Sequence, residues 1–217
     1  MTLRLETQAD VDAGLRQLVK QDPRLEQVLA VAGRPALRRR AGGFAGLAQI
    51  ITNQQLSTAS ASAIWARVTK AYDPLHPEKI RRARATTLAR HGLSGAKIRA
   101  FKAIAVAIRD GLDLDALADL PADDAHRALT ALHGVGPWTA DIYLLFCLGH
   151  ADAWPAGDLA VQEAMRLAFH LKARPTAKQM GPLAEPWRPL RGVAALLLWT
   201  YYRAVKKRDA VPIPPTP

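Results

Sequence analysis

Apolar residues recur at helical spacing along almost the whole chain. Clear examples are Val11, Leu15, Leu18 and Val19, and then Ile98, Phe101, Ile104, Ala105 and Ile108. Residues three or four positions apart lie on one face of an α-helix. No segment alternates apolar and polar residues in the way that a half-buried strand does. The pattern therefore predicts an all-α protein.

Glycine and proline residues interrupt this pattern at intervals. The breaks lie at residues 33–35, 42–43, 73–77, 92–95, 111, 121, 134–137, 155–157, 175 and 186–189. Such clusters mark turns and helix ends, and they predict about eight to ten helices joined by short loops. The proline-rich residues 211–217 form a tail that we expect to fray.

The charge balance of the chain is strongly basic. It carries 30 Lys and Arg residues against 19 Asp and Glu residues, a formal net charge of +11. An excess of this size favours a polyanionic partner, with nucleic acid as the first candidate. The alternative is a basic surface that serves solubility alone. The apolar content of 49% provides enough core for one domain or two small helical lobes.

The cysteine content limits the chemistry of the protein. Cys147 is the single cysteine, which excludes an intrachain disulfide, a cysteine-based zinc site and a four-thiolate iron–sulfur cluster. The sequence also contains no signal peptide pattern and no run of about 18 to 20 apolar residues. We therefore expect a soluble, cytoplasmic protein that does not span a membrane.

A glycine-rich turn separates two helical segments near residue 135. Gly134 and Gly136 flank Val135, and Pro137 and Trp138 follow. Two glycines around one apolar residue allow a backbone too tight for Cβ atoms. Such a turn exposes backbone amides at the start of the next helix, where they can bind a phosphate without reading base sequence. Taken alone the signal is weak, because glycine also ends many helices.

Two other motifs give this turn its context. The chain carries Asn-Gln-Gln-Leu-Ser at 53–57 and Trp-Pro-Ala-Gly-Asp-Leu at 154–159. With the turn, they resemble the helix-hairpin-helix superfamily of DNA glycosylases, specifically its alkylpurine branch, 3-methyladenine DNA glycosylase II. The resemblance spans roughly Ile50 to Trp199.

The resemblance implies two helical lobes with an active-site cleft between them. Residues 42–157 would form a central lobe that ends in the hairpin at 132–139, and residues 1–41 would pack with 158–217. The N-terminal antiparallel domain of larger bacterial members is expected to be absent. The implied activity is excision of alkylated purines, such as 3-methyladenine and 7-methylguanine, from double-stranded DNA in base excision repair, by a monomer.

By resemblance, Asp158 is the catalytic residue. The local sequence offers a second role, because Asp158 precedes an amphipathic segment and is a good helix N-cap; the two roles are compatible. Family members that also cut the DNA strand carry a lysine where this chain has Trp138. Without that amine nucleophile, the enzyme is expected to stop at an abasic site.

The expected base pocket consists of Trp138 and Trp199, whose electron-rich faces would select a cationic base; ordinary core packing is the alternative. Trp154, Trp187, Tyr143 and Tyr201 are assigned to the core or surface.

The DNA contacts are also expected from the resemblance. The hairpin would bind DNA through Gly134, Val135, Gly136, Trp138 and Thr139. The carbonyl groups of Thr130, Leu132 and Val135 would hold a structural Na⁺ or K⁺, and no cofactor is required. Gln55, with Leu56 beside it, would be the wedge that fills the space left by a flipped base, although both glutamines of the motif could instead only stabilise a turn.

Two other functions stay open from the sequence. One is a non-catalytic helix-hairpin-helix module that only binds DNA, for which Asp158 would be dispensable. The other is a glycosylase for a neutral damaged base, which needs a donor or acid in the pocket; His133 is the residue considered for that role.

Overall fold

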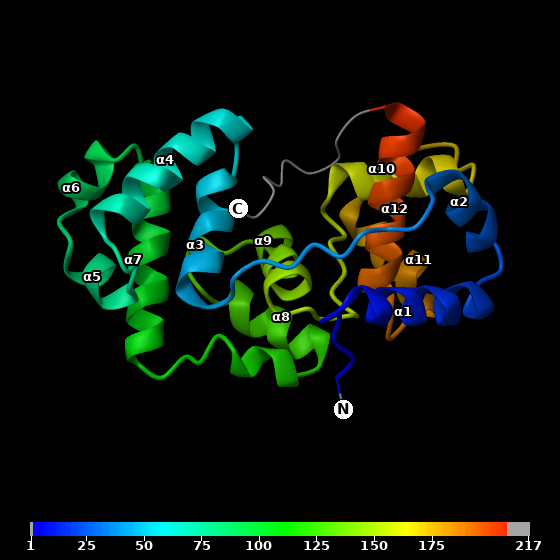
Figure 1. The fold of residues 1–217 in the computed structure, drawn as a ribbon, viewed down its shortest axis with the longest axis horizontal. Helices are drawn as coiled ribbons and strands as arrows, with labels where there is room; N and C mark the ends of the chain where they lie inside the picture. Colours follow the sequence, from blue (N-terminus) through cyan, green and yellow to red (C-terminus); the bar gives the residue numbers. More distant parts are fainter. Residues whose placement is uncertain (1, 208–217) are drawn as a thin grey trace.

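The computed structural model describes residues 2–207, and these form an all-α protein, as the apolar pattern predicted (Figure 1). Within them, an isolated bridge between Arg4 and His150 is the only β-type pairing. The helices are α1 (Gln8–Gln21), α2 (Leu25–Ala32), α3 (Gly43–Asn53), α4 (Thr58–Ala71), α5 (Pro77–Arg82), α6 (Ala85–Arg90), α7 (Gly95–Arg109), α8 (Ala122–Thr130), α9 (Pro137–Ile142), α10 (Leu159–Ala168), α11 (Ala177–Ala184) and α12 (Arg191–Lys206). Three shorter helical segments are η1 (Ala116–Asp119), the π-helical η2 (Tyr143–Cys147) and η3 (Glu185–Trp187).

The prediction of about eight to ten helices was therefore too low. Helices α5 and α6 have six residues each, which is less than two turns of α-helix. So short a helix does not repeat its apolar face, and each buries one side chain, Ile80 and Leu88 respectively. Helix α5 has a side-chain cap, in which His76 accepts a hydrogen bond from the Glu78 amide, whereas α6 has none.

The helices form two lobes (Figure 1). Helices α3 to α9 lie on one side, and α1, α2, α10, α11 and α12 lie on the other. Helix α12 packs against α1, α2 and α10, so the second lobe combines segments from both ends of the described chain. Residues 33–42 and 148–158 carry the chain between the lobes. Residues 208–217, which include the expected tail, lie outside the described residues.

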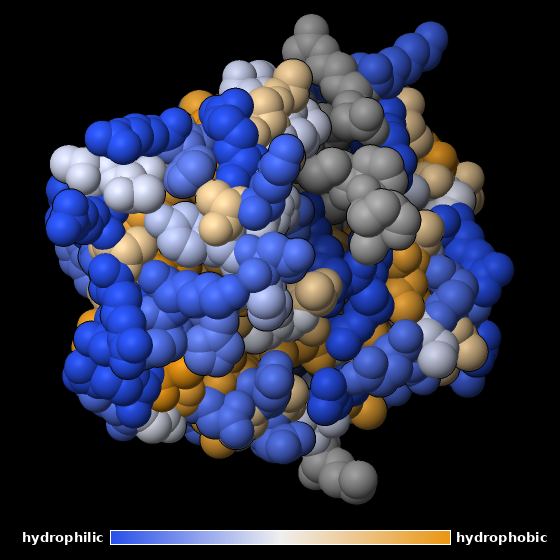
Figure 2. Space-filling model, turned by 60° about the vertical axis from the view of Figure 1, so that its left-hand side comes forward, coloured by the Kyte–Doolittle hydropathy of each residue, from blue (hydrophilic) through white to orange (hydrophobic). Residues whose placement is uncertain are grey.

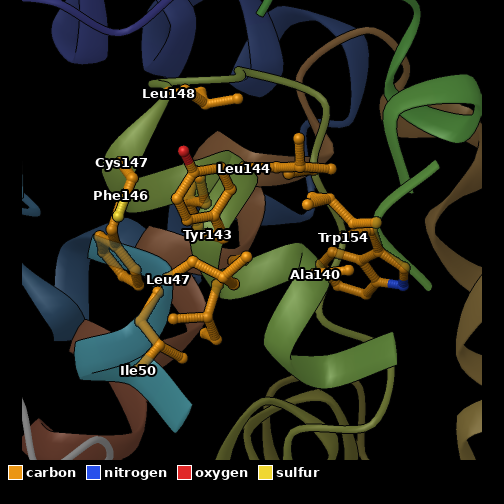
Figure 3. Packing of buried hydrophobic residues seen from close by; sticks show 14 of the residues in the cluster. Leu47, Ile50, Ala140, Tyr143, Leu144, Phe146, Cys147, Leu148 and Trp154 are labelled. Carbon is orange, nitrogen blue, oxygen red and sulfur yellow. The ribbon is translucent and has the colours of Figure 1, made fainter. Parts of the chain in front are cut away.

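The core of the first lobe forms around α9 and η2. Ala140, Tyr143 and Leu144 are buried there, and they lie against Leu47 and Ile50 of α3 (Figure 3). Full burial of a side chain such as Leu47 stabilises the fold by about 1.5 to 3 kcal/mol. This packing fixes α9, and with it the hairpin, relative to α3.

Hydrophilic residues cover most of the face shown in Figure 2. Among residues 2–207, no helix is both long and apolar enough to cross a membrane.

A buried charge network joins the two lobes. Arg191 at the start of α12 donates from Nε to Oδ1 of Asp152 at 2.9 Å and from Nη2 to Oδ2 at 2.8 Å. The same guanidinium reaches Asp123 of α8 at 3.1 Å, and Arg188 reaches both carboxylates. Because Arg191 and Asp152 are almost fully buried, each needs the other as a partner.

Candidate active site

Asp158 begins helix α10 and caps it. Its Oδ1 atom accepts hydrogen bonds from the amides of Ala160 and Val161, both at 3.0 Å. The negative charge also lies at the positive end of the helix dipole. The cap role that the local sequence offered is therefore present in the structure.

Two tryptophan side chains donate to the same carboxylate. Nε1 of Trp138 lies 2.9 Å from Oδ2 of Asp158, and Nε1 of Trp199 lies 3.0 Å from Oδ1. Together with the two amides, four donors surround one carboxylate. An ionised carboxylate is a pure acceptor, so these four donors orient the group.

The rings of the two tryptophans differ in their surroundings. Trp199 is 7% exposed, and its ring packs on Phe146 with centroids 5.6 Å apart and the planes tilted by 30°. Trp138 is half-buried. The structure thus brings all three expected residues of the catalytic and base-pocket groups together, and it adds hydrogen bonds that the sequence did not predict.

The loop before Asp158 is held by its own contacts. The indole of Trp154 donates to the carbonyl of Met180 at 3.1 Å, and the amide of Asp158 donates to Pro155 at 2.9 Å. Gln162, one turn into α10, donates to the carbonyl of Ala156 at 2.8 Å. These bonds place Asp158 beside Trp138, although 20 residues separate the two in sequence.

Helices α8 and α9 form the hairpin with the expected glycine turn between them. Gly134 has φ +84°, and a Cβ atom there would lie 2.4 Å from Cβ of Ala100 on α7. Gly136 differs, because its φ is −83° and no heavy atom lies within 4 Å of a Cβ placed on it. The expectation that the turn is too tight for a Cβ at both glycines is therefore wrong for Gly136.

The other expected hairpin residues lie as follows. Val135 and Thr139 are buried, and the amide of Val135 donates to the carbonyl of Leu132 at 3.1 Å. The amides of Trp138 and Thr139 fall in the first turn of α9, where no intrahelical acceptor exists. The Leu132 carbonyl that accepts the Val135 amide is one of the three, with those of Thr130 and Val135, that were expected to hold a monovalent cation.

The expected wedge residues lie in the loop between α3 and α4. Gln55 is exposed and has φ +55°, and Leu56 is half-buried. His133, the donor considered for a neutral base, is exposed on the hairpin.

The other aromatic residues were assigned to the core or surface. Tyr143, Trp154 and Trp187 are buried, and Tyr201 is half-buried. The indole of Trp187 donates to the carboxylate of Asp22 at 2.9 Å.

A second group of titratable residues lines a cavity of about 520 Å³ beside the hairpin. His126 Nδ1 lies 2.8 Å from Oδ1 of Asp141 there. Burial raises the pKa of Asp141 to about 6, and the hydrogen bond to Asp141 raises the pKa of His126. Sequence reasoning missed this pair and the network around Arg191; a lone arginine before the apolar run 192–199 was the available signal.

Residues 48–189 match the family model described as "HhH-GPD superfamily base excision DNA repair protein", and the chain belongs to this family. Its relatives include DNA-3-methyladenine glycosylase 1 of Schizosaccharomyces pombe, which is 30% identical over 158 residues, 70% of this chain and 69% of that protein. The crystal structure of DNA-3-methyladenine glycosidase from Bacillus halodurans superposes with a TM-score of 0.82 at 29% identity, over 92% of this chain and 93% of that one.

The match to other relatives is partial. The chain is 29% identical to DNA-3-methyladenine glycosylase of Bacillus subtilis over 76 residues, which are 35% of this chain and 25% of that protein. It spans 31% of another Bacillus subtilis relative.

Proposed function

We propose that this protein is a DNA glycosylase that excises alkylated purines, of the 3-methyladenine and 7-methylguanine class, from duplex DNA in base excision repair. The observation that carries the proposal is the buried carboxylate of Asp158, fixed by two backbone amides and two indole groups. The family and the named activities of the relatives point to the same chemistry.

One carboxylate is sufficient for this reaction. Cleavage of a glycosidic bond passes through a sugar with oxocarbenium character, and most glycosidases add a second carboxyl group to protonate the leaving group. A purine alkylated at N3 or N7 is already cationic and leaves as a neutral molecule. Asp158 then needs only to stabilise the sugar cation and orient the attacking water.

The two tryptophans have two proposed roles in this mechanism. Their indole N–H groups hold Asp158, and the ring face of Trp199 that does not pack on Phe146 is the surface proposed for the cationic base. A cation on an aromatic face gains about 0.5 to 2 kcal/mol. A neutral, unmodified purine lacks that gain.

The hairpin and the wedge loop are the proposed DNA contacts. The free amides at the start of α9 would bind a phosphate. A Cβ atom placed on Gly136 would meet no protein atom, so the space beside these amides is open. Gln55 is the exposed residue proposed to enter the duplex, with Leu56 beside it. The reaction is proposed to need no cofactor, and a monovalent cation at the hairpin carbonyls would have a structural role only.

The decisive experiment is incubation with methylated duplex DNA and chromatography of the released bases. We expect the wild-type protein to release 3-methyladenine and 7-methylguanine, and Asp158→Asn to release almost none while it still binds the DNA. Asp113→Asn is the matched control, because Asp113 is exposed and also accepts backbone amides, from Asp115 and Ala116, at the start of η1.

The outcomes separate the alternatives. Binding without any release would make the protein a non-catalytic helix-hairpin-helix module. Release of neutral damaged bases alone would make it a glycosylase for another lesion. Release of methylated bases by Asp158→Asn at the wild-type rate would contradict the proposed mechanism.

The proposed absence of lyase activity rests on Trp138, which stands where a nucleophilic lysine would be needed. Reaction in the presence of borohydride is expected to yield no covalent protein–DNA adduct. A trapped adduct would show that another amine attacks the sugar and that the enzyme is bifunctional.

A further inference from the structure

The end of helix α3 is held by a lysine from another helix. Nζ of Lys97, on α7, donates to the carbonyl of Thr52 at 2.7 Å and to that of Gln54 at 3.0 Å. The last carbonyls of a helix have no intrahelical donor and carry partial negative charge. Lys97 therefore satisfies two of these groups at the point where α3 stops.

A second bond holds the same loop from the hairpin side. Nε2 of Gln54 donates to Oγ1 of Thr139 at 2.6 Å. Thr139 is 2% exposed and lies in the first turn of α9. The backbone that follows α3 is thus joined both to α7 and to the helix that follows the hairpin turn.

Gln55 comes directly after these anchors, and its backbone is unusual. Its φ of +55° lies in the left-handed region, which non-glycine residues rarely adopt. Such a conformation persists when the surroundings impose it, and it is frequent at sites of binding and catalysis. On the other side of the loop, Ser57 caps α4 by accepting the amide of Ser60. Gln55 and Leu56 are therefore the two residues between fixed ends.

We propose that Lys97 and the Gln54–Thr139 hydrogen bond are the positioning device of the wedge, holding Gln55 and Leu56 ready to enter the duplex when a base flips. This inference rests on the proposed function. A loop that is ordered before binding loses less conformational entropy when it inserts. Because Thr139 belongs to the hairpin, the same bond links insertion of the wedge to binding of the DNA backbone by the hairpin.

The chain offers a matched control on the same helix. Lys102 of α7 also donates to two carbonyls, those of Arg81 at 2.9 Å and Ala83 at 2.6 Å, where α5 ends. Lys97→Met and Lys102→Met therefore remove the same charge and the same kind of hydrogen bond. They differ in that only Lys97 holds the loop of Gln55.

The test measures base unstacking and base release separately. The DNA is a methylated duplex with 2-aminopurine beside the modified purine, whose fluorescence rises when stacking is lost. We expect Lys97→Met to slow both the fluorescence rise and single-turnover release about tenfold relative to Lys102→Met. A wedge that is no longer held in position must be ordered during insertion, and this raises the barrier. Binding to undamaged DNA should fall equally in the two variants.

Thr139→Val provides an independent variant that keeps the side-chain volume and removes the acceptor of Gln54. It should slow the fluorescence rise in the same direction, even if Lys97→Met does not fold. Equal rates for Lys97→Met and Lys102→Met, or a normal fluorescence rise in Thr139→Val, would overturn the inference while wild-type release upholds the proposed function. A wild-type protein that neither unstacks nor releases a base would overturn both.

Discussion

The indole nitrogen of Trp199 lies 3.0 Å from Oδ1 of Asp158, and both side chains are almost inaccessible to solvent. A hydrogen bond to a charged group contributes about 1.5 to 3 kcal/mol. The residues are 41 positions apart, on α12 and at the start of α10. Helix α12 therefore helps to define the position of the carboxylate as well as to form the core.

Trp199→Phe separates the two roles of this residue, because it keeps an aromatic ring and removes the donor. We expect single-turnover base release to fall at least about tenfold, the equivalent of one such bond. Trp199→Leu should slow release of a cationic base by a further two- to thirtyfold, roughly, and release of a neutral base by less. Equal rates for Trp199→Phe and wild type would show that the hydrogen bond does not matter to the reaction.

The two hairpin glycines should respond differently to alanine. Gly134→Ala should destabilise the fold by about 1 to 3 kcal/mol, because of the positive φ and the contact with Ala100. Gly136→Ala should change stability by less than about 0.5 kcal/mol, yet weaken DNA binding, because the added methyl group lies outside the protein, where the phosphate is proposed to bind. Urea unfolding and fluorescence anisotropy measure the two effects.

The salt dependence gives the control for this pair. Since Gly136 carries no charge, Gly136→Ala should leave the slope of log affinity against log salt concentration unchanged. Equal destabilisation by both substitutions, or unchanged DNA affinity in Gly136→Ala, would contradict the prediction.

The network around Arg191 should be important for stability. Arg191→Met leaves Asp152 buried with only Arg188 nearby, and we expect a loss of about 3 to 5 kcal/mol in the free energy of unfolding. Arg127→Met is the control, because the pair of Arg127 with Asp124 is exposed on α8 and should contribute less than about 1 kcal/mol. Similar losses in the two variants, measured by urea unfolding, would contradict this.

The His126–Asp141 pair predicts a pH dependence of stability. Both folded-state pKa values are raised, that of Asp141 by burial and that of His126 by its bond to Asp141, with Asp123 and Arg191 also acting on both. The folded chain therefore binds these protons more tightly than the unfolded chain, and the contribution of the pair declines as the pH rises through these pKa values. Asp141→Asn should make stability fall less steeply between about pH 4 and about pH 8, because the Asp141 contribution is lost between its ordinary pKa of 3.8 and about 6 and that of His126 at higher pH. Parallel curves for wild type and variant, from urea unfolding across this range, would refute the assignment.

The helical fold could be predicted because its signals are local. The break at residues 92–95 separates α6 from α7, and that at 134–137 separates α8 from α9. The same reasoning predicted too few helices, because α5 and α6 are too short for a repeating apolar face. It also treated Gly134 and Gly136 alike, since the sequence does not contain the contact with Ala100 that distinguishes them.

The candidate site was only partly accessible from the sequence. The local pattern predicted Asp158 as a helix cap, and the resemblance placed Trp138 and Trp199 near it. The hydrogen bonds of Lys97 to Thr52 and Gln54 span more than 40 residues, and neither partner's side chain gives a signal because the acceptors are carbonyls. Contacts of this kind depend on how helices pack, which no local pattern encodes.

The path of the chain also sets an order of assembly on the ribosome. Gly14 of α1 lies against Val193 of α12, so the second lobe closes only after residues 191–206 have been synthesised. The hairpin, by contrast, is complete more than 50 residues earlier in the sequence, and its contacts with α3 and α7 are already available. The hydrogen bond from Trp199 to Asp158, on which the proposed mechanism depends, is therefore among the last contacts of the site to become available as the chain is synthesised.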